Sequence, residues 1–182
     1  MNIPNALTLL RVALIPAFIV FLMLGYSYVA AGIFVAASLT DALDGYLARK
    51  LKQVTNFGKL MDPLADKLLV VSALVCLTAL GDIAAWMVIV ILAREFMITG
   101  LRSLAAAEGV VMPAYMSGKL KTSAQMVAII LLLLKNWPFS YLGLPVDRVM
   151  LWIAVALTAY SGVEYIVRNR ELFKAKKKEG GS

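Results

Sequence analysis

The stretch "DALDGYLARKLKQVTNFGKLMDPLAD", residues 41–66, places four aspartates between two long apolar segments. The first two are three residues apart and the last two are four apart, so each pair shares one face of a predicted helix. The short turn between the segments predicts antiparallel neighbouring helices whose acidic faces meet. The four residues are Asp41, Asp44, Asp62 and Asp66.

Four carboxylates at one place repel one another, and divalent cations relieve that repulsion. The chain has no histidine and only one cysteine, Cys76, which lies in an apolar run. The available ligands are therefore oxygen atoms, which favour Mg²⁺, with Mn²⁺ or Ca²⁺ able to replace it. The alternative is a set of salt bridges to Arg49, Lys59 and Lys67.

Small residues share the faces of the aspartates: Gly45 and Ala48 on the first helix, and Gly58 on the second. Small residues let membrane helices pack closely. They also let a flat or bulky ligand lie against the backbone beside a metal, and we expect this second role here.

The composition predicts an integral membrane protein. Of the 182 residues, 62% are hydrophobic, more than a soluble domain of this size can bury. Six apolar segments are each about 20 residues long, enough for a helix to cross about 30 Å of hydrocarbon. The fold class expected is therefore all-α, with six transmembrane helices at residues 5–25, 28–49, 60–80, 83–104, 117–135 and 149–168.

The basic residues predict the orientation. All lysines and arginines except Lys135 and Arg148 fall at or near one set of segment ends, which puts both termini in the cytoplasm. Anionic lipid headgroups explain the net charge of +7 better than nucleic acid does. We expect one transmembrane catalytic domain over residues 1–170 and a basic, disordered cytoplasmic tail over 171–182.

Charged residues also intrude into the cytoplasmic halves of the segments, among them Arg11, Arg94 and Glu95. Each would cost a few kcal/mol if it faced lipid. These side chains are therefore expected to face a shared polar cavity that opens to the cytoplasm.

The aspartate stretch reads D-x-x-D-G-x-x-A-R, then eight residues, then G-x-x-x-D-x-x-x-D. This pattern resembles the complete signature of the CDP-alcohol phosphatidyltransferase family. The stretches "NIPNALTLLRVALIP" at 2–16, "AREFMITGLR" at 93–102 and "GKLKT" at 118–122 look like the phosphatidylglycerophosphate synthase branch. The resemblance covers essentially the whole chain.

The resemblance implies a homodimer in the bacterial cytoplasmic membrane, with a cytoplasm-facing site that holds two Mg²⁺ or Mn²⁺ ions. It implies transfer of a phosphatidyl group from CDP-diacylglycerol to sn-glycerol 3-phosphate, giving phosphatidylglycerophosphate and CMP. Asp41, Asp44 and Asp62 would hold the metals. Asp66 would share in ligation and act as the base, two roles that compete.

Substrate contacts follow from the same resemblance and from residue chemistry. The nucleotide would rest on Gly45, Ala48 and Gly58, with Arg49 near the diphosphate. Asn5 and Thr8 share a helix face and would bond the nucleotide, unless they serve as a helix cap and a backbone contact. Four cations are candidates for the acceptor phosphate, with Glu95 orienting one arginine; interfacial snorkelling is their alternative role. These are Arg94, Arg102, Lys119 and Lys121.

Three other functions remain open. A sibling transferase would use serine, inositol phosphate or a second phosphatidylglycerol; the four cations favour a phosphorylated acceptor. An intramembrane prenyltransferase resembles a longer chain of about nine helices. A cation transporter would need polar residues near mid-bilayer, whereas runs such as "IVFLMLG" and "IILLLL" carry no charge.

Overall fold

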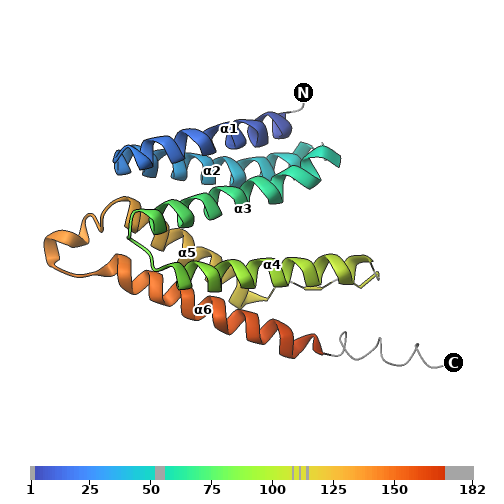
Figure 1. Ribbon diagram of the computed structural model, residues 1–182. Helices are drawn as coiled ribbons and strands as arrows, with labels where there is room; N and C mark the ends of the chain where they lie inside the picture. Colours follow the sequence, from blue (N-terminus) through green and yellow to red (C-terminus); the bar gives the residue numbers. More distant parts are fainter. Residues whose placement is uncertain (1–2, 52–55, 108, 111, 114, 171–182) are drawn as a thin grey trace. The chain divides into compact units, whose positions relative to one another are not determined.

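The computed structural model describes residues 3–51, 56–107, 109–110, 112–113 and 115–170, and every regular element in these ranges is helical (Figure 1). The all-α class is therefore confirmed. Each of the six predicted segments coincides with one α-helix. The α-helices are α1 Ile3–Met23, α2 Ser27–Leu51, α3 Asn56–Ala79, α4 Ala85–Ala107, α5 Met116–Leu133 and α6 Val146–Arg168, and a 3₁₀ turn, η1 Phe139–Leu142, precedes α6.

Two glycines end their helices in the left-handed conformation. Gly25 has φ of 87° and Gly81 has φ of 83°, values that only glycine adopts without strain. After each glycine the next amide bonds back to the helix, Tyr26 to the carbonyl of Phe21 and Asp82 to that of Leu77. These bonds satisfy carbonyls that the last turn would leave free, so α1 and α3 stop there.

The chain forms two compact units. The first contains the residues up to Ala84 together with Ile129–Asp147, and the second contains Ala85–Ala128 and the residues from Arg148 onward. Helices α1, α2 and α3 belong to the first unit, α4 and α6 from Arg148 onward belong to the second, and α5 contributes to both.

In the first unit, α1, α2 and α3 pack side by side and alternate in direction (Figure 1). The face that α2 buries consists mainly of alanines such as Ala30 and Ala37, which allow a neighbouring helix to approach closely. Phe18 of α1 and Phe34 of α2 are both fully buried, and their ring centroids are 5.9 Å apart. These contacts fix the arrangement that carries the aspartates.

In the second unit, α4 and α6 run in the same direction (Figure 1). Contacts between them follow the same order along both helices, which is the mark of a parallel pair. The contacts join Trp86 to Trp152, Arg94 to Ser161 and Arg102 to Tyr165. The polar residues of α4 thus meet α6 along one shared seam.

Among the described residues, α5 and α6 are long and apolar enough to cross a membrane. The apolar parts of α1, α2 and α3 in those ranges are shorter, and α4 carries Arg94, Glu95 and Arg102. Membrane crossing by all six helices, and the side on which the termini lie, stay predictions.

Candidate functional site

The backbone brings the predicted donor-site positions to one end of the α1–α3 group. Asp41 and Asp44 lie in the second half of α2, and Asp62 and Asp66 lie in the first half of α3. Because α2 and α3 are antiparallel and in contact, these two stretches meet at the same end (Figure 1). The start of α1 reaches that end as well.

Other predicted positions lie on α1, α2 and α3 at the same end as the aspartates. Their side chains, like those of the aspartates, lie outside the described residues, so their contacts and the metal site stay predictions. Among the described residues, no group of three or more carboxylates, histidines or cysteines could hold a metal ion. The accompanying positions are Asn5 and Thr8 on α1, Gly45, Ala48 and Arg49 on α2, and Gly58 on α3.

Arg11 is a buried cation close to this end of the helices. It lies one turn after Thr8 on α1 and is 0% exposed. Its Nε donates to the carbonyl of Ala37, 3.3 Å away, and Ala37 lies one turn before Asp41 on α2. The guanidinium thus reaches across to α2 beside the aspartate segment.

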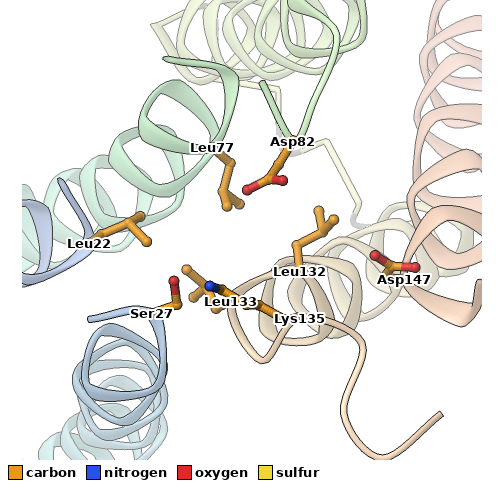
Figure 2. A pocket seen from close by; sticks show the side chains of 8 residues that line it. All are labelled: Leu22, Ser27, Leu77, Asp82, Leu132, Leu133, Lys135 and Asp147. Carbon is orange, nitrogen blue, oxygen red and sulfur yellow. The ribbon is translucent and has the colours of Figure 1, made fainter. Parts of the chain in front are cut away.

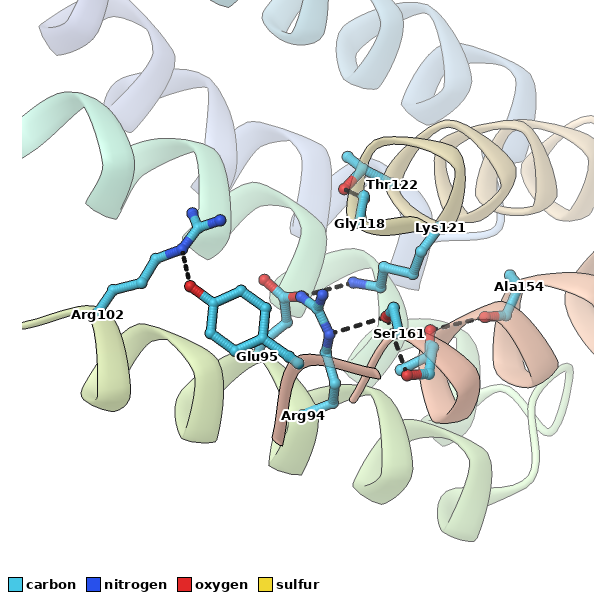
Figure 3. Close-up of polar contacts among 10 residues, drawn as sticks. Arg94, Glu95, Arg102, Gly118, Lys121, Thr122, Ala154 and Ser161 are labelled. Atoms are coloured by element: carbon cyan, nitrogen blue, oxygen red, sulfur yellow. Dashed lines mark hydrogen bonds and ion pairs between the residues drawn. The ribbon is translucent and has the colours of Figure 1, made fainter. Parts of the chain in front are cut away.

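In the second unit, two of the predicted phosphate-binding cations converge on Glu95. The carboxylate Oε1 of Glu95 accepts from Nη1 of Arg94 at 2.9 Å and from Nζ of Lys121 at 2.7 Å (Figure 3). Lys121 is only 2% exposed. We call these three residues the Glu95 cluster; its formal charge is +1, and the predicted contact of Glu95 with an arginine is confirmed.

The side chain of Arg94 is held in a slot between α5 and α6. Its Nε donates to the hydroxyl of Ser161 at 3.1 Å (Figure 3). A Cβ added at Gly162 would come within 3.3 Å of Cγ of Arg94, and one at Gly118 within 3.4 Å of its Nη2. A larger residue at 162 would press on the aliphatic stem of Arg94, and one at 118 would touch its guanidinium, so the slot restricts where the side chain can lie.

Arg102 lies about two turns after Arg94 on α4, and a tyrosine of α6 holds its side chain. Its Nε donates to the hydroxyl of Tyr165 at 2.9 Å, and its guanidinium carbon lies 5.5 Å from the centre of that ring. Tyr165 is buried and also packs edge-on against Tyr115. Arg102 is itself exposed, so its remaining N–H groups are available to a ligand.

Lys119 does not join the Glu95 cluster. It lies two positions from Lys121, and such a spacing puts two side chains on opposite faces of a helix. Lys119 is exposed and makes no ion pair with a residue that the structure describes. The structure thus brings Arg94 and Lys121 together, with Arg102 on the same seam of α4 and α6.

Sequence reasoning missed Ser161, Gly162 and Tyr165, which hold the two arginines from α6. Each is an ordinary residue in an apolar helix, and more than 60 positions separate it from its partner. The detectable signal is the stripe of small and polar residues on one face of α6, where Thr158, Ser161 and Gly162 are buried.

A separate cavity of about 250 Å³ lies in the first unit (Figure 2). Ser27, Asp82, Lys135 and Asp147 line it together with four leucines. Ser27 begins α2, Asp82 follows α3, Lys135 follows α5 and Asp147 lies in the first turn of α6. In α2 and α3 these are the opposite helix ends from the aspartates. This cavity is therefore distinct from the predicted donor site.

The chain resembles known proteins over nearly its whole length. Residues 1–160 match the family model described as CDP-alcohol phosphatidyltransferase. The chain is 46% identical to the CDP-diacylglycerol–glycerol-3-phosphate 3-phosphatidyltransferase of Bacillus subtilis, over 95% of this chain and 97% of the relative. Proteins of the same name are 42% identical in Rickettsia bellii, over 94% and 97%, and 43% identical in Pseudomonas fluorescens, over 91% and 89%. The signature of residues 41–66, the all-helical fold and these matches together establish that the chain belongs to the CDP-alcohol phosphatidyltransferase family.

Proposed function

We propose that this chain transfers the phosphatidyl group of CDP-diacylglycerol to sn-glycerol 3-phosphate, forming phosphatidylglycerophosphate and CMP. The observation that carries the proposal is the likeness, at 42–46% identity and over almost full length, to relatives named for this reaction. The likeness extends beyond the signature to α4 and α5, which carry the cations that suit a phosphorylated acceptor.

The acceptor phosphate binds at the seam of α4 and α6. Arginine presents a fork of N–H donors that matches phosphate oxygens, and lysine adds a point charge. Arg94 and Lys121 are already within 3 Å of a shared carboxylate oxygen, so their donors are directed at one small region. Arg102 adds exposed donors along the same helix, whereas Lys119 lies on the opposite face of α5 from Lys121 and is left out of this proposed site.

The donor lipid binds at the aspartate end of α1, α2 and α3. Its nucleotide rests against Gly45, Ala48 and Gly58, with Arg49 near the diphosphate, and Asn5 and Thr8 offer polar groups from α1. This placement is supported by the helix directions, which bring all of these positions to one end.

The metal ligands available at this end of the helices fit two hard divalent cations, Mg²⁺ or Mn²⁺. Four carboxylates on two contacting helices supply oxygen ligands and need counter-charge. Asp41, Asp44 and Asp62 would hold the ions, with Asp66 sharing in ligation. When bound, such ions neutralise diphosphate charge and make CMP a better leaving group.

The reaction itself is a displacement at phosphorus that depends mainly on positioning. The acceptor hydroxyl loses its proton to Asp66 as its oxygen forms a bond to the lipid-side phosphorus, and the bond from that phosphorus to CMP breaks. A carboxylate is the available base, because the chain has no histidine.

We also propose that residues 1–170 form one catalytic domain of six transmembrane helices, with both termini and the site facing the cytoplasm and a basic tail over 171–182. Such chains would pair as homodimers in the bacterial cytoplasmic membrane. In a Cys76→Ala background, Ser140→Cys should react with an impermeant maleimide from outside intact cells, and Ser182→Cys should react only after lysis. Labelling of both from one side would overturn this arrangement.

The test of the activity uses purified protein with radiolabelled sn-glycerol 3-phosphate. Label should enter the lipid fraction only when CDP-diacylglycerol is present, and CMP should appear in equal amount. Free glycerol should be a very poor acceptor, because it lacks the phosphate that the cations bind. Faster transfer to inositol phosphate or serine would keep the family and replace the acceptor.

A further inference from the structure

An open groove of about 500 Å³ lies on the second unit, between the first turns of α5 and the last turns of α6. Its volume falls in the range of about 300–1,000 Å³ that is typical of ligand pockets. None of the three residues of the Glu95 cluster lines it. We call it the α5–α6 groove; six of its lining residues are Ser117, Leu120, Leu157, Tyr160, Glu164 and Arg168.

The groove changes from apolar to charged along its length. Leu157, Glu164 and Arg168 follow one stripe of α6, so the apolar end lies toward the middle of the helix and the charged end at its last turn. Leu120 on α5 is 55% exposed and Tyr160 is 63% exposed, so the walls of the apolar part lack a protein cover. Among the described residues, α5 and α6 are long and apolar enough to span a bilayer, and this gradient matches that of a lipid at a membrane surface.

At the charged end, two buried polar atoms have no hydrogen-bond partner among the residues that the structure describes. Ser117 is 9% exposed, and its hydroxyl makes no hydrogen bond with any part of the chain that the structure describes. Oε2 of Glu164 is equally buried and, among those residues, also lacks a donor. Buried polar groups are nearly always satisfied, so this end suits a ligand that brings hydroxyl groups.

A cation stands at the mouth of the groove. Arg168 donates through Nη2 to Oε1 of Glu164 at 2.9 Å, and its guanidinium lies 4.8 Å from the ring centre of Tyr115. The side chain is still 57% exposed, so it can turn donors toward an anion. The sequence continues with Arg170 and then four lysines, which adds positive charge after this helix end.

We propose that the α5–α6 groove binds one molecule of an anionic phospholipid whose headgroup carries hydroxyl groups. One acyl chain lies against Leu120 and Leu157, the phosphate meets Arg168, and the headgroup hydroxyls reach Glu164 and Ser117. The proposal rests on the membrane placement of α5 and α6 and not on the transferase reaction.

The test measures lipid binding to delipidated full-length protein in detergent by native mass spectrometry, without turnover. Dioleoylphosphatidylglycerol should bind with a Kd about tenfold lower than dioleoylphosphatidylcholine, a difference that the net negative charge and the headgroup hydroxyls supply. It should also bind better than dioleoylphosphatidic acid, which is anionic but has no headgroup hydroxyl. The Ser117→Ala variant should reduce the difference in Kd between phosphatidylglycerol and phosphatidic acid.

Matched variants separate the groove from general lipid contact. Leu120→Trp, which obstructs the groove, and Arg168→Gln should each raise the Kd for dioleoylphosphatidylglycerol about tenfold. Val163→Trp introduces the same side chain at a 63% exposed position of α6 that does not line the groove, and it should leave the Kd unchanged. Size-exclusion profiles of all variants check that each is folded.

Three results would overturn the proposal. The first is equal binding of phosphatidylglycerol and phosphatidylcholine, or tighter binding of phosphatidylethanolamine. The second is the same effect from Leu120→Trp and Val163→Trp. The third is full displacement of phosphatidylglycerol by an equal concentration of CDP-diacylglycerol, which would assign the groove to the donor lipid.

Discussion

The ammonium Nζ of Lys121 donates to Oε1 of Glu95 across 2.7 Å, from a side chain that is 2% exposed. A lysine so deeply buried needs a counter-charge, and Glu95 supplies it while also bonding Arg94. The same carboxylate therefore stabilises the helix contact and directs two cations that we assign to the acceptor phosphate.

Removing that carboxylate should destabilise the protein. In Glu95→Gln the buried ammonium loses its partner, at a cost on the order of 3 kcal/mol. The double variant Glu95→Gln/Lys121→Met leaves no unpaired charge and should recover much of that loss. Thermal unfolding in detergent, followed by circular dichroism, measures the loss of stability in the single variant and its recovery in the double variant. A double variant as unstable as the sum of the two single variants would mean that the pair is not coupled.

Gly162→Ala should separate stability from acceptor binding. Alanine in place of a helical glycine stabilises by up to about 1 kcal/mol, but here the new Cβ would press on Arg94 from 3.3 Å. We expect unchanged or higher thermal stability and a KM for glycerol 3-phosphate raised roughly fivefold through displacement of the guanidinium. Gly100→Ala in α4 is the control, because a Cβ there meets nothing within 4 Å. Equal KM values for glycerol 3-phosphate in Gly162→Ala and Gly100→Ala would contradict the proposal that the slot positions Arg94 for the acceptor.

Arg102→Ala should raise the KM for glycerol 3-phosphate about tenfold, since a charge-assisted bond to phosphate contributes about 1.5–3 kcal/mol. Tyr165→Phe should have a smaller effect, because it removes the 2.9 Å bond to Nε but keeps the ring under the guanidinium. The measurement is a two-substrate kinetic matrix in detergent micelles. A rise in the KM for CDP-diacylglycerol instead would assign Arg102 to the nucleotide.

Alanine at Asp41, Asp44 or Asp62 should abolish turnover, because each removes a ligand from the proposed metal site. EDTA should do the same to the unmodified protein, and added Mg²⁺ or Mn²⁺ should restore activity. Substantial turnover in any of the three variants, or indifference to chelation, would rule out the two-metal site.

Asp66→Asn distinguishes a base from a ligand. If Asp66 mainly accepts the proton, kcat should collapse while metal binding and the affinity for CDP-diacylglycerol stay close to those of the unmodified protein. Calorimetric titration of the metal provides the second measurement. Loss of metal binding in parallel with kcat would make Asp66 principally a ligand.

The sequence predicted the helices well because hydrophobic length is a strong and local signal. The start of α3 was placed at residue 60, but the helix begins at Asn56, because polar residues can extend a helix beyond its apolar part. The spacing of Lys119 and Lys121 already indicated opposite faces, and grouping them by charge alone overlooked it. The α6 partners of the two arginines, Ser161 for Arg94 and Tyr165 for Arg102, could not be predicted, because they depend on the offset between two parallel helices, which hydropathy does not encode.

The bond from Arg11 to the carbonyl of Ala37 has a consequence for how α1 and α2 align. Two helices that meet through alanines have few interlocking side chains to oppose a shift of one helix along the other. A buried guanidinium bonded to one carbonyl fixes a single register between α1 and α2. That anchor lies one turn before Asp41, so a shift of α1 by one residue would be transmitted directly to the aspartate end. Arg11→Lys keeps the charge but loses the planar donor at Nε. Without that bond, more than one register between α1 and α2 would become accessible at the end where the donor lipid is expected to bind.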